Sequence, residues 1–139
     1  MPIGMVLLPV FVQVALTFVI GLWMGASRVG TLRTRKLKPA DIALGQPGWP
    51  EKTTKISNAY HNQLELPLLF YILVAFGLLT AKADLVFAVM SWLFVGSRIV
   101  HAVIHTGSNM LQRRFYAFAF GFVVLVTMWI IFAFRILTS

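Results

Sequence analysis

The sequence predicts an all-α integral membrane protein that folds as a four-helix bundle. Hydrophobic residues make up 59% of its 139 residues and charged residues only 12%, with a mean hydropathy of +0.84, whereas a soluble domain has about 25% charged residues. The apolar residues form long runs without alternation, which indicates membrane-spanning helices rather than strands. The length allows a single domain over residues 1–139.

The runs predict helices over about residues 3–26, 57–80, 85–105 and 114–135. Each approaches or exceeds the ~20 residues that cross ~30 Å of hydrocarbon. The first run lacks a basic leader, so we interpret it as a retained span rather than a cleavable signal peptide. Pro67 is expected to bend the second helix, because it removes a backbone hydrogen bond. Short connections make the second, third and fourth helices antiparallel neighbours.

Positive charge is concentrated on one side of the predicted bundle. The net charge is +8, and only Lys82 and Arg135 lie on the opposite side. The positive-inside rule therefore predicts a cytoplasmic connection over residues 27–56, with both termini outside the cytoplasm. This charge suits anionic lipid head groups better than nucleic acid, because no soluble fold presents it. The basic residues on the cytoplasmic side are Arg28, Arg33, Arg35, Lys36, Lys38, Lys52, Lys55, Arg113 and Arg114.

Ionisable residues inside the second and third spans mark a candidate site. A charge in hydrocarbon costs about 2.5–3.5 kcal/mol on insertion scales, so such residues face the bundle interior and pair with one another. Glu65 and Arg98 fall at the same predicted depth on neighbouring helices, which predicts a salt bridge between them. His101 and His105 follow Arg98 at helical spacing and share its face.

Further polar residues come to the same cytoplasmic third of the bundle. His61 and Asn62 lie on the helix face of Glu65, Arg28 ends the first helix, and Arg113 and Arg114 begin the fourth. An arginine-rich pocket of this kind suits a ligand with carboxylates, which guanidinium groups bind bidentately. By contrast, the aromatic residues of the fourth helix, Phe115 and Phe118 among them, are expected to face lipid or pack against other helices.

Three other interpretations remain open. A structural ion pair that fixes helix register explains Glu65 and Arg98 but not the additional polar groups. A metal site built from His101 and His105 is opposed by the neighbouring guanidinium groups, and we assign no metal ligand. A small transporter is opposed by the absence of an inverted repeat. Because the chain has no cysteine, any thiol chemistry must come from a cofactor.

Two segments carry a resemblance to a known family. The segment His61-Asn62-Gln63-Leu64-Glu65-Leu66-Pro67 resembles the second-helix signature of the membrane-associated proteins in eicosanoid and glutathione metabolism (MAPEG). The segment Ser97-Arg98-Ile99-Val100-His101 resembles the third-helix motif of that superfamily. Together with the four predicted helices, the resemblance extends over about residues 10–135.

The resemblance implies a homotrimer that binds glutathione between subunits and takes lipophilic small molecules from the membrane lipids. It implies that Arg114 stabilises the glutathione thiolate, and this is the predicted catalytic residue, although Arg113 also matches the position. The predicted cofactor-binding residues are Arg28, His61, Asn62, Glu65, Arg98, His101, His105 and Arg113. Of these, Asn62, Glu65, Arg98 and His101 match ligand-binding positions of the family.

The sequence also departs from the family pattern. His61 stands where glutathione-using members often carry arginine, and His105 where enzymes often carry tyrosine. Phe115 and Phe118 occupy the positions of the hydroxyl residues that follow the arginine of the fourth helix. The sequence thus predicts a glutathione-dependent transferase or peroxidase, with a non-catalytic lipid-binding or scaffold protein of the same fold as the alternative.

Overall fold

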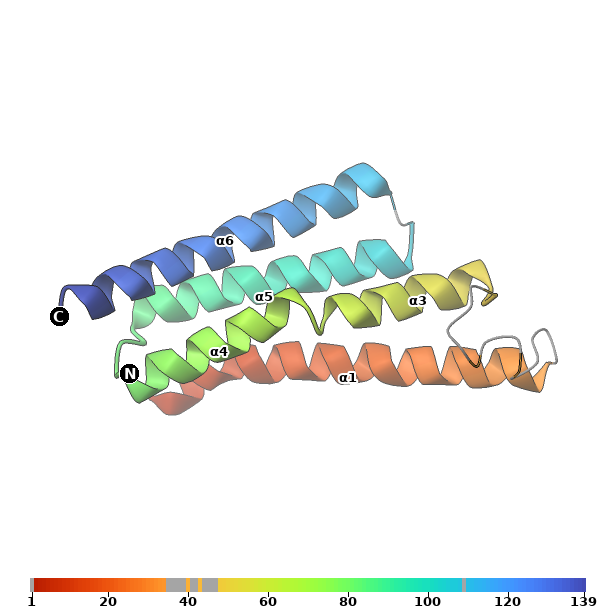
Figure 1. Ribbon diagram of the computed structural model, residues 1–139, viewed down its shortest axis with the longest axis horizontal. Coiled ribbons are helices and arrows are strands. Elements are labelled where there is room, and N and C mark those ends of the chain that lie inside the picture. Colours follow the sequence, from red (N-terminus) through yellow and green to blue (C-terminus); the bar gives the residue numbers. More distant parts are fainter. Residues whose placement is uncertain (1, 35–39, 41–42, 44–47, 109) are drawn as a thin grey trace.

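A computed structural model of the chain describes residues 2–34, 40, 43, 48–108 and 110–139. It confirms the all-helical membrane architecture: the described residues form helices and turns without strands, and four segments are long and apolar enough to span a membrane. The helices are α1 (Ile3–Arg33), α3 (Glu51–Asn62), α4 (Leu66–Leu79), α5 (Leu85–Thr106) and α6 (Leu111–Leu137). Figure 1 shows them lying side by side, with both termini at one end.

The long helices extend beyond the bounds that the sequence predicts. α1 continues to Arg33 rather than ending near residue 26, and α3 begins at Glu51 rather than near residue 57. The expectation of a connection over the whole of 27–56 is therefore corrected, since polar residues continue both helices past the apolar runs. Three of the basic residues expected there, Arg35, Lys36 and Lys38, lie outside the described residues.

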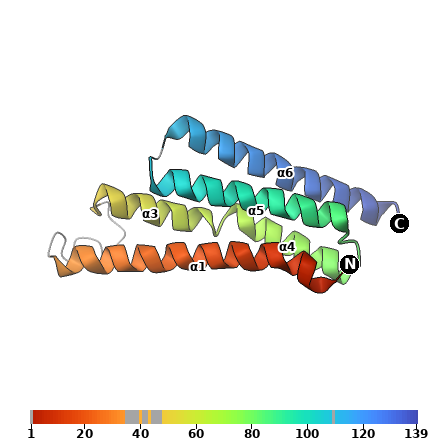
Figure 2. The same ribbon diagram turned by 180° about the vertical axis from the view of Figure 1, so that it is seen from behind.

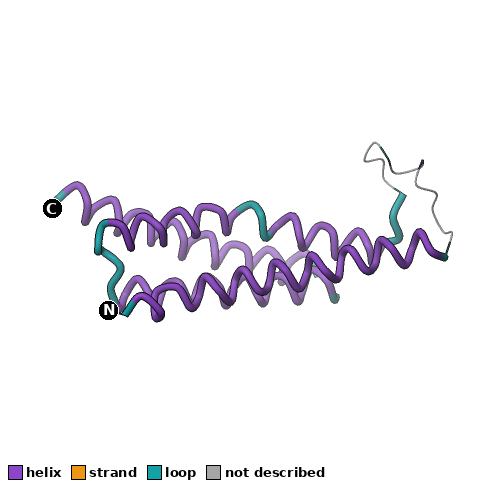
Figure 3. Tube along the Cα trace, turned by 90° about the horizontal axis from the view of Figure 1, so that it is seen from below, coloured by secondary structure: helices purple, strands orange, loops and turns teal. Residues whose placement is uncertain are grey.

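The second span is interrupted near its middle. Residues 63–65 form a turn between α3 and α4, and Figure 3 shows this turn as a short loop within an otherwise helical segment. Pro67 lies in the first turn of α4, where its missing N–H has no helical partner to lose. The bend expected at Pro67 is thus a break one turn earlier, because the proline ring clashes with the carbonyl of residue i−4, here Gln63, and offers it no N–H.

Buried apolar side chains hold the half of the bundle nearest the termini. Phe70, Leu73 and Phe94 are fully buried there, with Val95 and Leu125. A smaller cluster joins α1, α3 and α5 at the other half and centres on Ile56 and Ala59. The outer surface is largely apolar, as lipid contact requires.

The two ends of the bundle differ in charge. Arg28, Lys55, Arg113 and Arg114 lie at the end opposite the termini, and we call this the basic end. Figure 2 shows from behind that the turn between α5 and α6 lies near this end as well. At the other end, Ala81 adopts a left-handed conformation with φ of 57°. The N–H of Lys82 donates to Gly77 O at 2.9 Å, which is a Schellman ending for α4.

Candidate functional site

The break between α3 and α4 positions the polar residues of the second span. The amide of Gln63 is buried and accepts a hydrogen bond from Gln13 Nε2 on α1 at 2.9 Å, while Gln63 Nε2 donates to Ala59 O at 3.1 Å. The N–H of Leu64 closes a tight turn on His61 O at 3.0 Å. This arrangement turns Asn62 and Glu65 towards α5 and α6 instead of continuing the helix.

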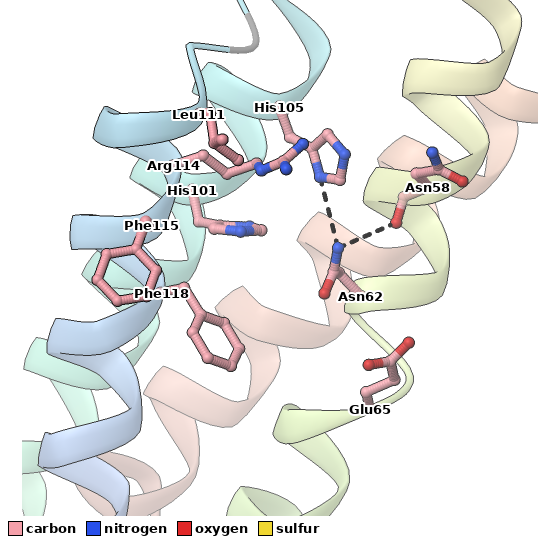
Figure 4. Close-up of a pocket in the computed structure, with 9 residues that line it drawn as sticks. All are labelled: Asn58, Asn62, Glu65, His101, His105, Leu111, Arg114, Phe115 and Phe118. Carbon is pink, nitrogen blue, oxygen red and sulfur yellow. Dashed lines mark hydrogen bonds between the residues drawn. The ribbon is translucent and has the colours of Figure 1, made fainter.

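Arg98, His101 and His105 form a buried stripe along α5. Their exposed fractions are 1%, 3% and 5%, as the helical spacing of the three residues predicts. The rings of His101 and His105 lie edge to face with centroids 5.5 Å apart. The stripe faces α3: Nδ1 of His105 is 3.4 Å from Asn62 Nδ2, a contact drawn in Figure 4.

Arg98 does not form the predicted salt bridge with Glu65. Its Nη2 instead donates to the backbone carbonyl of Asn62 at 3.2 Å, and Glu65 is exposed at the helix break. The expectation of a direct Glu65–Arg98 ion pair is wrong in this chain. The helix break leaves the backbone carbonyl of Asn62 without a helical partner, and Arg98 donates its hydrogen bond to that carbonyl instead. The two residues nonetheless lie near enough to interact electrostatically.

A pocket of about 460 Å³ lies between α3, α5 and α6 at the basic end (Figure 4). Its volume falls within the ~300–1,000 Å³ typical of ligand pockets. One wall is polar and comes from α3 and α5, whereas α6 adds aromatic and aliphatic side chains around a guanidinium group. The lining residues are Asn58, Asn62, Glu65, His101, His105, Leu111, Arg114, Phe115 and Phe118.

The pocket brings together several of the residues singled out in the sequence. Asn62, Glu65, His101, His105 and Arg114 all line it, and Arg98 lies directly behind Asn62.

Three other candidates lie elsewhere in this chain. Arg28 donates to Ser57 Oγ at 2.8 Å and stacks over Trp49, between α1 and α3. His61 is exposed on α3. Arg113 points to a different groove between α5 and α6. The same-chain pocket therefore holds only part of the predicted set.

The exposed rings of Phe115 and Phe118 also line the pocket, a role that the expectation of lipid contact or packing does not include. The Phe118 ring lies 6.2 Å from the His101 ring. A signal for this existed in the spacing, because residues 111, 114, 115 and 118 share one face of a helix. Asn58 is a further lining residue, one turn before Asn62.

Several buried polar atoms near the pocket have no hydrogen-bond partner in the described part of the chain. They are Nε and Nη1 of Arg98 and Nδ1 of His101. Such groups carry a free-energy cost that a bound acceptor or water offsets. Among the described residues, no three His, Asp or Glu side chains gather as metal ligands do. The pocket therefore has donors and positive charge suited to an organic anion.

The charge pattern specifies the anion further. Arg98 and Arg114 bring positive charge, Glu65 lies on the lining as a single carboxylate, and Phe115 and Phe118 form an apolar side. Such a site fits a ligand that has carboxylates, one cationic group and an apolar or reactive part.

Comparison with known proteins gives one match. The model of the MAPEG family matches residues 6–134, which covers nearly all of the chain. The chain matches none of the curated proteins and none of the solved structures with which it was compared.

Proposed function

Because this chain belongs to the MAPEG family, we propose that it binds glutathione and uses it as a transferase or peroxidase on lipophilic electrophiles. The observation that carries the proposal is the pocket of about 460 Å³ at the basic end, where one guanidinium group, two amides and a carboxylate line the same cavity. Four other cavities lined by described residues lack this combination of groups.

The residues of the pocket fit the charges of the tripeptide. Glutathione has two carboxylates and one ammonium group. The pocket lining offers the guanidinium group of Arg114 and the carboxylate of Glu65, while Arg98 is buried behind Asn62 and adds positive charge without lining the pocket. The amides of Asn58 and Asn62 provide neutral donors beside them. Charge-assisted hydrogen bonds of this kind are roughly twice as strong as neutral ones.

In the proposed mechanism, Arg114 acts on the reacting atom. Its guanidinium group favours the thiolate of glutathione by electrostatic attraction. Glutathione supplies the nucleophile: a transferase reaction forms a carbon–sulfur bond as the leaving group departs with its electron pair. Phe115 and Phe118 present an apolar wall that excludes water and admits a lipophilic electrophile.

A second candidate function is a non-catalytic lipid-binding or scaffold protein of the same fold. It is favoured by Phe115 and Phe118, which line the pocket at positions where the resemblance implies hydroxyl residues. Without those hydroxyls, stabilisation of a thiolate depends on Arg114 and the field of Arg98. The two functions differ in turnover, not in fold.

We also propose that the protein is a homotrimer. The exposure of Glu65 and His61 supports this, because ionisable side chains in a membrane span rarely face lipid. In a trimer, Arg28 and His61 would be available to the pocket of a neighbouring subunit. Light scattering of the purified protein should give the mass of three chains, and a monomer at all concentrations would contradict the proposal.

The proposed orientation places the basic end in the cytoplasm, because Lys and Arg residues concentrate there. A reporter fused to the C-terminus should then be non-cytoplasmic. A cytoplasmic reporter would reverse the orientation and put the pocket on the other side of the membrane.

Titration calorimetry of the purified protein with glutathione tests the binding proposal. We expect binding at millimolar concentration or below and a severalfold loss of affinity in Arg114→Gln. Lys82→Gln, which removes the same charge at the opposite end, should bind as the unaltered protein does. Absence of binding, or equal losses in both variants, would overturn the assignment of the pocket.

A further inference from the structure

A second groove between α5 and α6 lies on the face away from the glutathione pocket. It has a volume of about 630 Å³, and its lining is almost wholly apolar. A Cβ built on Gly121 would clash with Ser97 Oγ, so α6 approaches α5 very closely at that point. The groove lies along this contact and extends to the basic end, where Arg113 and Tyr116 line it.

The α5 wall of the groove has the length of one lipid leaflet. Trp92, Gly96, Val100 and Ile104 recur at every fourth position and form a continuous stripe. At 1.5 Å per residue this stripe is about 18 Å long, compared with ~15 Å for half of a ~30 Å hydrocarbon core. An acyl chain that entered at the basic end would therefore reach the level of the bilayer midplane.

The mouth of the groove carries positive charge. Arg113 is exposed, and the described residues offer it no hydrogen bond or ion pair. Tyr116 lies one turn further along the same helix face, and its hydroxyl accepts a weak hydrogen bond from Gln112 Nε2 at 3.4 Å. That hydroxyl can still donate to another acceptor. Anionic lipid head groups are attracted to such juxtamembrane basic residues.

We infer that this groove binds an anionic phospholipid, with one acyl chain along the Trp92–Ile104 stripe and the phosphate on Arg113 and Tyr116. The charge at the mouth favours this occupant over a neutral lipid. The site is separate from the proposed glutathione pocket and does not depend on that function.

Quenching of tryptophan fluorescence by brominated lipids tests the inference, because Trp92 lines the groove. A single-tryptophan protein that retains Trp92 is made by changing Trp23, Trp49 and Trp129 to phenylalanine. It is reconstituted into phosphatidylcholine vesicles that contain a small fraction of phosphatidylglycerol with brominated chains. The reference vesicles carry the same brominated chains on phosphatidylcholine.

We expect the groove to bind phosphatidylglycerol about fivefold more tightly than phosphatidylcholine. This ratio corresponds to the attraction between one basic side chain and one anionic head group. Arg113→Gln should remove this preference, whereas Lys52→Gln, at the same end but outside the groove, should keep it. A protein that retains only Trp129 is a matched control, because the groove around Trp129 has no charged lining residue. It should show no preference.

Equal quenching of Trp92 by both lipids would overturn the inference, as would a preference that survives Arg113→Gln. Quenching by neither lipid would show that another chain covers the groove. Native mass spectrometry of the unaltered protein and Arg113→Gln provides a second measurement, in case the tryptophan variants do not fold. Retained phosphatidylglycerol should then outnumber phosphatidylcholine only in the unaltered protein.

Discussion

Arg98 is a buried charge whose hydrogen bonding is incomplete: its side chain is 1% exposed and is bonded to a single backbone carbonyl. Two of its nitrogens lack a partner in the described part of the chain. A buried charge with incomplete hydrogen bonding contributes little to stability and can oppose it. Its position behind Asn62 therefore points to a role in attracting an anion rather than in holding the fold.

Arg98→Met separates these two roles, since it keeps an extended side chain and removes the charge. We expect the unfolding temperature in detergent to stay the same or rise. Affinity for glutathione should fall tenfold or more, because a unit charge within ~8 Å contributes about 2 kcal/mol at an effective dielectric constant near 20. Circular dichroism and calorimetry measure the two quantities. A less stable protein with unchanged affinity would assign Arg98 to structure alone.

Phe118 offers a gain-of-function prediction. Its ring lies 6.2 Å from that of His101 and lines the pocket. Phe118→Tyr adds a hydroxyl that can donate a hydrogen bond to a thiolate, so turnover of a model electrophile with glutathione should rise severalfold. Phe120→Tyr, on the opposite groove, is the matched control and should leave turnover as it was. Equal turnover in all three proteins would argue for the non-catalytic alternative.

At the residue level, helical spacing was sufficient to group Asn62 with Glu65 and Arg98 with both histidines. It was not sufficient to predict the partner of Arg98. The sequence shows that Glu65 and Arg98 share a depth, but not that the break frees the carbonyl of Asn62. Composition also does not show that the exposed Phe115 and Phe118 line a pocket, because an apolar pocket wall and a lipid-facing surface contain the same kinds of side chain.

Among the elements, the interrupted second span determines the shape of the site. Its turn is tied to α1 by the Gln13–Gln63 hydrogen bond of 2.9 Å, and both side chains are buried. Loss of this tie would release the segment that carries Asn62 and Glu65.

Replacement of either glutamine by leucine should destabilise the protein by about 1–3 kcal/mol, because the remaining amide is buried without its partner. The double replacement should cost less than the sum of the two single replacements. Unfolding in mixed detergent micelles, followed by circular dichroism, measures all three variants. Simple additivity would show that the two amides do not depend on each other.

The end opposite the pocket is held by a different contact. Asp84 caps α5 by accepting from the N–H of Phe87 at 3.0 Å and pairs with Arg135 at 2.8 Å. The hydrogen bond from Arg135 is the main reason that the pKa of Asp84 is lowered. A lowered folded-state pKa adds stability that is complete above the unfolded-state pKa of about 3.9 and is lost as the pH falls below it.

Asp84→Asn should therefore cost under about 1 kcal/mol at neutral pH, since Asp84 is half exposed and surface ion pairs contribute little. Asparagine can still cap the helix, so only the ion pair is lost. The difference in stability from the unaltered protein should shrink as the pH falls below about 3.9 and through the lowered pKa of Asp84. Thermal unfolding across pH 3–7 tests this, and a difference that persists in acid would assign it to the cap.

The four apolar runs of the sequence were sufficient to predict the number and order of the membrane spans. They were not sufficient to predict where the helices end, because α1 and α3 continue as helices through polar residues that water can solvate. The break at residues 63–65 was visible only as a bend, since Pro67 indicates a disturbance without specifying which backbone groups it frees.

In the molecule as a whole, polarity is distributed unevenly. The half near the termini is packed with buried apolar side chains, whereas the basic end contains the pocket, the buried arginine and the second groove. A chain arranged in this way presents a polar site to one side of the membrane and apolar access from within the bilayer. This combination matches a reaction between a water-soluble thiol and a lipid-soluble partner.

The central claim is that the pocket binds glutathione as a thiolate beside Arg114, and ultraviolet thiolate absorbance measures this most directly. On mixing the purified protein with millimolar glutathione at neutral pH, we expect an absorbance increase that saturates with protein sites and is strongly reduced in Arg114→Ala. Lys82→Ala should give the full signal. If calorimetry detects binding but no thiolate absorbance develops, the pocket holds the tripeptide without activating it. If neither signal is found at millimolar glutathione, the account of the site is wrong.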